Sequence, residues 1–261
     1  MQMMKIGAQM YTVRNSCQTL DGFAESLKKI ADIGYTSVQV SGACDFEPEW
    51  LAEELKKNGL TCDLTHTGFE RLCDETEKVV AEHRLFGCRY IGLGSIPGVW
   101  DLEDEHKLQA YAPYVEKAKP MVRKARELGA KIMYHNHAFE YLSGGDKNII
   151  ERMEEDFDAD AYGFTLDTYW AQFAGADPVK ELNRLSGRVD CIHLKDMEIL
   201  PDGTKRFAWV GGGVMDFDAI LKAAEDAGTK YAFVEQDDCF GADPFDCLKK
   251  SYDFLASRGY R

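Results

Sequence analysis

Eight short apolar runs alternate with amphipathic stretches along the whole chain, and this alternation strongly limits the folds available to it. The runs are rich in β-branched and aromatic residues, as buried strands are, whereas the stretches between them have helical spacing. Eight consecutive strand–helix units favour a closed (β/α)8 barrel of the TIM type, in the α/β class, over an open sheet. The predicted strands are Lys5–Tyr11, Ser37–Val40, Thr61–Thr65, Tyr90–Leu93, Lys131–Asn136, Gly163–Leu166, Val189–Leu194 and Tyr231–Val234.

Glycines mark the ends of several predicted helices. A left-handed residue commonly closes a helix, and Gly34, Gly59, Gly129 and Gly228 each stand shortly before a predicted strand. No Pro-, Gly- or Ser-rich linker interrupts the pattern, so residues 1–261 are expected to form one barrel domain.

One segment departs from the strand–helix alternation. Residues 197–210 read as a β-hairpin inserted after strand seven, with its turn at Pro201–Gly203. Loops that follow barrel strands carry the active site in this fold, so the hairpin is expected to form a wall or lid there. The segment "GLGSIPG" after strand four is a poor dinucleotide fingerprint, because it lacks the G-x-G-x-x-G spacing.

Composition excludes some classes of partner. With 45 acidic and 31 basic residues the formal net charge is −14, which argues against nucleic acid, because that partner usually needs a basic face. No apolar stretch is long enough to cross a membrane, and the first residues do not have the pattern of a signal peptide. A cytoplasmic location is therefore expected, and the eight cysteines, none in a CxxC pair, are expected to be free thiols.

Carboxylates and imidazoles follow the last four predicted strands. The carboxyl ends of barrel strands meet at one mouth, so these side chains are expected to lie together. Buried charges need a partner, and a divalent cation suits carboxylate oxygens and imidazole nitrogens. The sequence therefore predicts one metal site at a mouth lined by Glu140, Asp167, His193 and Glu235, with His135, His137 and Lys195 nearby.

Five motifs in a fixed order carry a family resemblance. The motifs are "YHNHAFEY", "LDTYW", "HLKD", "GGGVMDF" and "VEQD". In this order the chain resembles the sugar phosphate isomerase/epimerase group of xylose isomerase-like barrels over nearly its whole length. The resemblance implies a small sugar, keto-sugar or cyclitol substrate and one divalent ion (Mn2+, Mg2+, Co2+ or Zn2+). It also allows a homo-oligomer, since members of the group often form dimers or tetramers.

The resemblance also implies a ligand set. It comprises Glu140, Asp167, His193 and Glu235. Glu140 follows the predicted end of strand five instead of closing it, so the chain must turn back over the mouth for this side chain to reach the ion. His137 is the alternative ligand if the chain does not turn.

The chemistry expected at such a site is deprotonation next to a ketone. A metal that holds a carbonyl and its neighbouring hydroxyl acidifies the adjacent C–H and stabilises the enediolate. By resemblance to epimerases, Glu140 and Glu235 exchange the proton on opposite faces, while His137 is an alternative base near neutral pH. Substrate contacts are predicted for His66, His135, Lys195 and Trp170, with structural support as the alternative role for His66, His135 and Trp170.

Three functions remain open at this point. The leading hypothesis is a metal-dependent isomerase or epimerase, and the runner-up is a lyase that dehydrates a keto-inositol or cleaves next to a 3-keto sugar. A non-catalytic sugar-binding barrel is the third. A three-zinc nuclease is disfavoured, because the six histidines of the chain are too few for such a site, and His83 and His106 are predicted on the surface.

The run Gly211–Gly213 either presents N–H groups to a phosphate or turns into a helix cap at Asp216.

Overall fold

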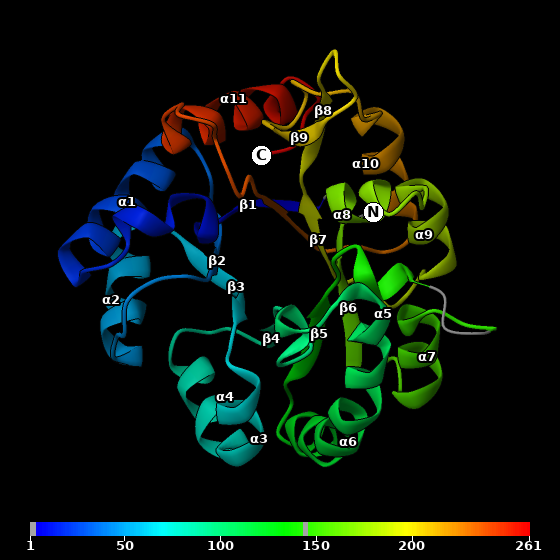
Figure 1. Ribbon diagram of the computed structural model, residues 1–261. Helices are drawn as coiled ribbons and strands as arrows, with labels where there is room; N and C mark the ends of the chain where they lie inside the picture. The colour runs from blue at the N-terminus through cyan, green and yellow to red at the C-terminus, as the bar shows by residue number, and fades with distance from the viewer. Residues whose placement is uncertain (1–3, 143–145) are drawn as a thin grey trace.

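The computed structural model describes residues 4–142 and 146–261, and its centre is a closed barrel of eight parallel strands (Figure 1). The order around the barrel is β1-β10-β7-β6-β5-β4-β3-β2, and neighbouring strands pair in parallel throughout. The predicted (β/α)8 barrel is therefore confirmed. The barrel strands are β1 (Lys5–Gln9), β2 (Ser37–Val40), β3 (Thr61–His66), β4 (Tyr90–Leu93), β5 (Lys131–His135), β6 (Tyr162–Asp167), β7 (Cys191–Leu194) and β10 (Tyr231–Val234).

Helices surround the barrel, as Figure 1 shows. They bury their apolar faces against the strands, and acidic or amide side chains cap several of them, as Asn148 does at α7. The helices are α1 (Leu20–Ile33), α2 (Pro48–Asn58), α3 (Phe69–Asp74), α4 (Thr76–Leu85), α5 (Asp104–Lys107), α6 (Tyr111–Glu127), α7 (Ile149–Asp156), α8 (Thr168–Phe173), α9 (Pro178–Arg184), α10 (Phe217–Asp226) and α11 (Pro244–Ala256). Short 3-10 turns lie at Met10–Ser16, Val99–Asp101, Leu108–Ala110 and Phe139–Tyr141.

The strand boundaries agree closely with those expected from the sequence. β2, β4 and β10 have the predicted limits, whereas β1 stops at Gln9 because the chain turns into a 3-10 helix at Met10. The four helix-ending glycines all have positive φ, which fits the role predicted for them. The prediction that residues 1–261 form a single domain stays a prediction.

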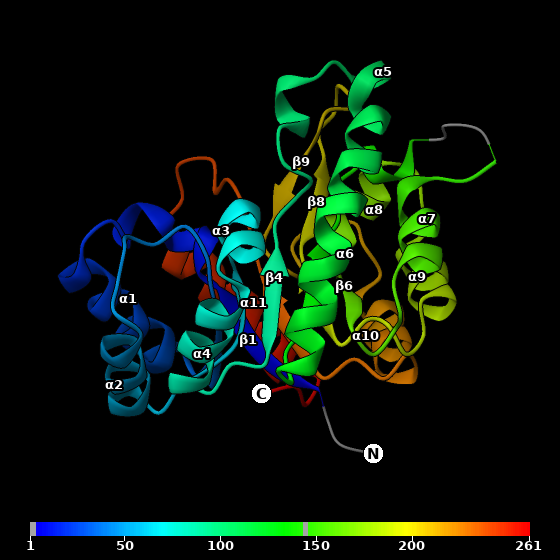
Figure 2. The same cartoon turned by 90° about the horizontal axis from the view of Figure 1, so that it is seen from below.

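The predicted hairpin after strand seven is present as β8 (Asp196–Ile199) and β9 (Lys205–Ala208), paired antiparallel. Figure 2 shows it at the end of the barrel opposite the C-terminus. Phe207 of β9 packs on Tyr169 of α8, with ring centroids 4.3 Å apart. The hairpin therefore packs against α8, the helix that follows β6.

The glycine run after the hairpin wraps around a carboxylate. The N–H groups of Gly211 and Gly213 each donate to Asp196 Oδ2 over 2.9 Å. A Cβ on Gly213 would lie 2.4 Å from Asp196 Oδ1, so only glycine fits this close approach. Asp216 then caps α10 through the N–H of Ala219. Of the two roles considered for the run, the turn into a cap is the one formed, and Asp196 uses the N–H groups that a phosphate would need.

The core occupies both the barrel interior and the layer between strands and helices. A layer inside the barrel is built by side chains from β3, β4, β5, β7 and β10: Leu64, Tyr90, Met133, Cys191 and Phe233. All eight cysteines are free, as predicted. Within residues 4–142 and 146–261, helices are too short or too polar to cross a membrane.

Candidate active site

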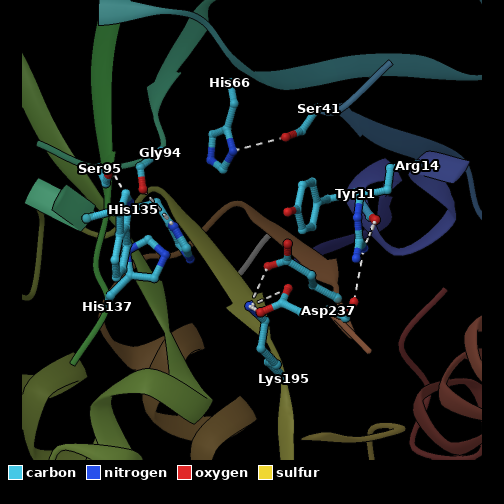
Figure 3. Close-up of a pocket in the computed structure, with 12 residues that line it drawn as sticks. Tyr11, Arg14, Ser41, His66, Gly94, Ser95, His135, His137, Lys195 and Asp237 are labelled. Atoms are coloured by element: carbon cyan, nitrogen blue, oxygen red, sulfur yellow. Dashed lines mark hydrogen bonds and ion pairs between the residues drawn. The ribbon is translucent and has the colours of Figure 1, made fainter. Parts of the chain in front are cut away.

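A cavity of about 390 Å3 opens at the carboxyl ends of the barrel strands (Figure 3). Its walls come from the segments that follow β1, β2, β4, β5, β7 and β10, together with the end of β3. In a (β/α)8 barrel this end is where catalytic groups gather. The lining residues are Tyr11, Arg14, Ser41, His66, Gly94, Ser95, Trp100, His135, His137, Lys195, Glu235 and Asp237.

At this end of the barrel four buried side chains form a compact cluster of metal-ligand type, and two of them, His135 and Glu235, line the cavity. One atom from each lies within 4.8 Å of the others. The strand register explains the meeting, because Asp167 of β6 pairs directly with His193 of β7, while the other two end or follow neighbouring strands. The cluster comprises His135, Asp167, His193 and Glu235.

Hydrogen bonds outside the cluster orient its two imidazoles. His193 Nε2 lies 2.6 Å from Gln39 Oε1, and His135 Nδ1 lies 3.3 Å from the carbonyl oxygen of Gly94. These oxygens accept hydrogen bonds, so ring protons on those two nitrogens would leave His193 Nδ1 and His135 Nε2 free to bind an ion beside the carboxylates. Such bonds from outside commonly set the tautomer of metal-binding histidines.

Inside the cluster, His135 Nε2 and Asp167 Oδ2 form a hydrogen-bonded pair at 3.1 Å, whereas His193 and Glu235 do not satisfy each other. His193 Nδ1 is 2.8 Å from Glu235 Oε2, yet the two are not aligned as a hydrogen bond, and neither has another such partner in the described part of the chain. Burial opposes the charged forms, but Lys195 and the histidines outweigh it and hold the pKa values of Asp167 and Glu235 well below their ordinary range. Two imidazole nitrogens and two ionised carboxylates suit a divalent ion of the Zn2+ or Mn2+ type.

Lys195 supplies positive charge to the same carboxylates. Its ammonium lies 2.9 Å from Asp167 Oδ2, 3.0 Å from Glu235 Oε2 and 3.1 Å from Asp237 Oδ1. The side chain is 1% exposed, and the three carboxylates outweigh the effect of burial, so its pKa lies above the ordinary value. A bound metal ion would share two of these oxygens with Lys195.

Two further histidines lie beside the cluster. The His137 ring centroid is 4.5 Å from that of His135, and both rings line the cavity, as expected from strand alternation. His66 pairs through Nδ1 with Ser41 Oγ at 3.2 Å. Burial, and then neighbouring His135, lower the pKa values of His66 and His137 well below the ordinary value. Both rings are therefore neutral at pH 7.

Glu140 lies outside the four-residue cluster. The 3-10 turn at Phe139–Tyr141 directs its carboxylate to the hydroxyl of Tyr134 (2.6 Å) and the N–H of His137 (2.7 Å). The residue is fully buried and does not line the cavity, and burial raises its pKa to about 8 against these hydrogen bonds. To bind an ion with the cluster, Glu140 would have to leave both partners.

Some lining residues were not singled out from the sequence. Asp237 lies two residues beyond Glu235, and burial raises its pKa to about 7 against the nearby Lys195. Arg14 donates to the backbone oxygens of Tyr11 and Asp237. The sequence feature that could have identified Asp237 and Arg14 is that each follows a barrel strand by a few residues. Trp170 lies near the cavity, with its ring 5.5 Å from that of His137, but does not line it.

The surface prediction for His83 is wrong. The ring is 5% exposed, with Nε2 2.8 Å from Thr65 Oγ1 and Nδ1 2.7 Å from the carbonyl oxygen of Val79. The contact with Thr65 attaches α4 to β3, whereas Val79 lies in α4 itself, and burial lowers the pKa of His83 to about 4. His106 is exposed, as predicted.

The fold and this site can now be set beside known proteins. The model of the family described as xylose isomerase-like TIM barrel matches residues 27–258. The chain belongs to this family.

Curated relatives and solved structures agree with this assignment. An inosose dehydratase of Lacticaseibacillus casei is 30% identical over 271 residues, covering 89% of this chain and 88% of that protein. An inosose dehydratase of Geobacillus kaustophilus is 25% identical over 191 residues, covering 66% of this chain and 61% of that protein. A sugar phosphate isomerase/epimerase from Parabacteroides distasonis has the same fold, with a TM-score of 0.75, 22% identity and coverage of 98% and 94%.

Proposed function

We propose that this chain is a divalent-metal-dependent lyase that dehydrates a small keto-cyclitol or keto-sugar. The observation that carries the proposal is the buried His135–Asp167–His193–Glu235 cluster, of which His135 and Glu235 line a cavity that a neutral histidine also lines. The extended similarity to an inosose dehydratase supports the choice of reaction.

His135, Asp167, His193 and Glu235 would hold the ion. A divalent ion bound there supplies a Lewis acid that polarises a ketone oxygen and acidifies the neighbouring C–H. His135 takes the place on strand five that the resemblance assigned to Glu140, because its Nε2 already faces Asp167 Oδ2 at 3.1 Å. Gln39 and Gly94 hold the two imidazoles in the required tautomers.

His137 is the proposed base. Its ring is neutral, lines the cavity, and has an Nδ1 without a hydrogen-bond partner among the described residues. The imidazole takes the proton from the carbon next to the ketone, and the electron pair of that C–H bond becomes the new C=C bond. The C–O bond of the neighbouring hydroxyl then breaks.

Asp237 and Lys195 are proposed to act on the departing hydroxyl. Both line the cavity, and their side chains are 3.1 Å apart. A carboxyl with a pKa of about 7 is partly protonated at neutral pH, so Asp237 can give the proton with which the hydroxyl leaves as water. Lys195 holds the substrate oxygen next to it.

An isomerase or epimerase is the second candidate, supported by Glu235 as a carboxylate in the cavity. Proton exchange on opposite faces needs a second base. Glu140, predicted for that role, is buried against Tyr134 and the backbone of His137. This arrangement favours elimination over two-carboxylate exchange. A sugar-binding barrel without catalysis remains the third candidate.

Two measurements test the proposal. Elemental analysis should find about one divalent ion per chain in the wild type and in Asp216→Ala, an exposed matched control, and little in Asp167→Ala. NMR in D2O with a keto-inositol should then show loss of water, whereas deuterium incorporation into an otherwise unchanged skeleton would indicate epimerisation. Equal, negligible metal in all three proteins, or no reaction of any keto-cyclitol or ketose, would contradict the proposal.

A further inference from the structure

Asp237 lies beyond the part of β10 that pairs with its neighbours. β10 pairs with β1 only as far as Ala8↔Val234, and β1 soon gives way to the 3-10 helix at Met10–Ser16. After Asp237 the chain is largely exposed and turns back at Phe240, the one non-glycine residue with positive φ (48°) in the part of the chain that the structure describes. The carboxyl group of Asp237 therefore stands where the barrel ladder has ended and an exposed loop begins.

Two side chains of the 3-10 helix at Met10–Ser16 hold the backbone around Asp237. Thr12 Oγ1 accepts a hydrogen bond from the N–H of Gln236 over 3.0 Å. Arg14 Nη1 donates to the carbonyl oxygen of Asp237, also over 3.0 Å (Figure 3). The carboxyl of Asp237 in turn accepts two hydrogen bonds of 3.1 Å from the ammonium of Lys195. The two backbone contacts thus help to determine where this carboxyl meets Lys195.

Arg14 is itself held firmly by its surroundings. Its guanidinium lies over the ring of Tyr11, 4.1 Å from the centroid, and Nη1 also donates to the carbonyl oxygen of Tyr11 over 2.8 Å. Gly42 packs closely against both residues, because a Cβ there would lie 3.1 Å from Arg14 Cβ and 2.9 Å from the Tyr11 ring. A planar guanidinium that is already fixed loses little conformational freedom when it bonds a backbone oxygen.

The remaining contacts of the loop after Asp237 attach it less firmly. Gln236 Nε2 donates to the carbonyl oxygen of Asp238, and Asp238 Oδ1 accepts from the N–H of Phe240, so both bonds lie within the loop. At its tip the guanidinium of Arg206 lies over the Phe240 ring, 5.0 Å from the centroid, and such contacts are weak where the ring is exposed. The bond from Arg14 is therefore an important link between Asp237 and the barrel.

We propose that Arg14 is a positioning residue for the reaction: through the carbonyl oxygen of Asp237 it fixes the carboxyl of that residue against Lys195, where the departing hydroxyl receives its proton. The role of Asp237 as the acid rests on the function proposed above. Misplacing a reacting group by about 1 Å can cost about a hundredfold in rate. Loss of the contact should therefore lower kcat strongly and change KM little, because substrate binding does not depend on it.

Arg14→Ala and Arg14→Met test the proposal with a keto-inositol as substrate. In both variants kcat should fall about a hundredfold, while KM stays within about threefold and the metal content is that of the wild type. Free guanidinium ion, well below denaturing concentrations, should restore part of kcat in Arg14→Ala, because it fits the space that the side chain leaves.

Arg188→Ala is the matched control. Arg188 is also half-buried and donates to a backbone oxygen, that of Phe157 (2.9 Å), but it does not line the reaction cavity. This variant should keep the wild-type kcat, and guanidinium ion should not raise it.

Hydrogen exchange gives a second readout, which needs no turnover. The amides of residues 236–242 should exchange faster in Arg14→Ala than in the wild type or Arg188→Ala, and guanidinium ion should slow them again. The amides of Tyr231–Val234 should stay protected in all three proteins, which shows that the barrel is folded.

An unchanged kcat in the Arg14 variants would overturn the proposal. A raised KM with unchanged kcat would also overturn it, because Arg14 would then only bind substrate. Wild-type exchange rates at residues 236–242 in Arg14→Ala would do the same. The function proposed above fails separately, if the wild type holds no metal or does not convert a keto-inositol, and hydrogen exchange then decides alone whether Arg14 fixes the segment.

Discussion

The two ends of the barrel both carry buried ionic groups, but they satisfy them differently. At the amino end, Asp190 accepts hydrogen bonds from Lys131 (2.5 Å), Lys230 (2.5 Å) and the hydroxyl of Tyr90 (3.2 Å). At the carboxyl end, the carboxylates of Asp167 and Glu235 face two imidazoles and one lysine.

Unsatisfied polar atoms gather at the carboxyl end. Among the described residues, the buried side-chain atoms without hydrogen-bond partners lie on strands at or near the mouth or on the segments that follow them, and the amino-end cluster contributes none. Each such atom costs free energy unless a ligand pairs with it. We infer from this comparison that the amino-end cluster serves stability, whereas the carboxyl-end cluster would be completed by a ligand. The buried side-chain atoms without hydrogen-bond partners are Gln9 Nε2, Gln39 Nε2, His66 Nε2, Asn136 Nδ2, His137 Nδ1, Tyr141 Oη, Thr165 Oγ1, Trp170 Nε1, His193 Nδ1, Glu235 Oε2 and Gln236 Oε1.

The largest effect is expected from Asp167→Asn. It removes a carboxylate from the cluster while keeping its shape, so metal binding should fall and turnover of a keto-inositol should drop by about a thousandfold or more. Calorimetric metal titration and steady-state rates measure this, with Asp216→Asn as the matched control. Full activity with undiminished metal affinity would show that the carboxyl-end cluster, like the amino-end cluster, does not need an ion to satisfy its polar groups.

Asp190→Ala should instead destabilise the fold. It leaves buried Lys131 without its carboxylate, which is expected to lower the free energy of unfolding by about 3 kcal/mol. Urea denaturation measures the loss. Asp253→Ala, which breaks the exposed pair with Lys249, should cost less than about 0.5 kcal/mol. Metal affinity should be unchanged by Asp190→Ala, because the amino-end cluster does not bind the ion. If Asp190→Ala were as stable as Asp253→Ala, the stabilising role of the amino-end cluster would be refuted.

The sequence predicted the barrel and three members of the cluster, because strand alternation and order are local properties. Asp167, His193 and Glu235 directly end or follow buried strands, so their meeting follows from parallel closure. The fourth member, His135, could not be predicted as a ligand from the sequence. Sequence spacing cannot show that a 3-10 turn sends Glu140 toward Tyr134, or that Gly94 orients His135. The contact between Arg14 and Asp237 joins segments distant in sequence, which only the fold brings together.

Lys195→Met should raise metal affinity about tenfold at neutral pH. The ammonium lies about 3 Å from the oxygens that a metal would use, so its removal leaves more negative charge for the ion. Lys222→Met, which breaks an exposed pair with Asp226, is the control for loss of a lysine. Calorimetry with Zn2+ checks this, and weaker binding in Lys195→Met would mean that the lysine supports the site instead of competing with the ion.

The smallest expected effect concerns acid stability. Burial opposes ionisation of Asp190, but Lys131 and Lys230 outweigh it and hold its pKa below the ordinary value. A carboxyl with a lowered folded pKa stabilises the protein above its unfolded pKa of about 3.9, and this contribution is lost as pH falls through the folded value. Asp190→Asn should therefore flatten the dependence of unfolding free energy on pH below about 4. An unchanged slope would contradict the pKa assigned to Asp190.

We propose that the carboxyl-end cluster binds a divalent ion through His135, Asp167, His193 and Glu235. Crystals soaked in Zn2+ and measured at the zinc absorption edge test it most directly. The account predicts one anomalous peak about 2.0–2.2 Å from His135 Nε2, His193 Nδ1 and the carboxylates of Asp167 and Glu235. A peak bound by Glu140 in place of His135, or no peak with Lys195 still between the two carboxylates, would contradict it.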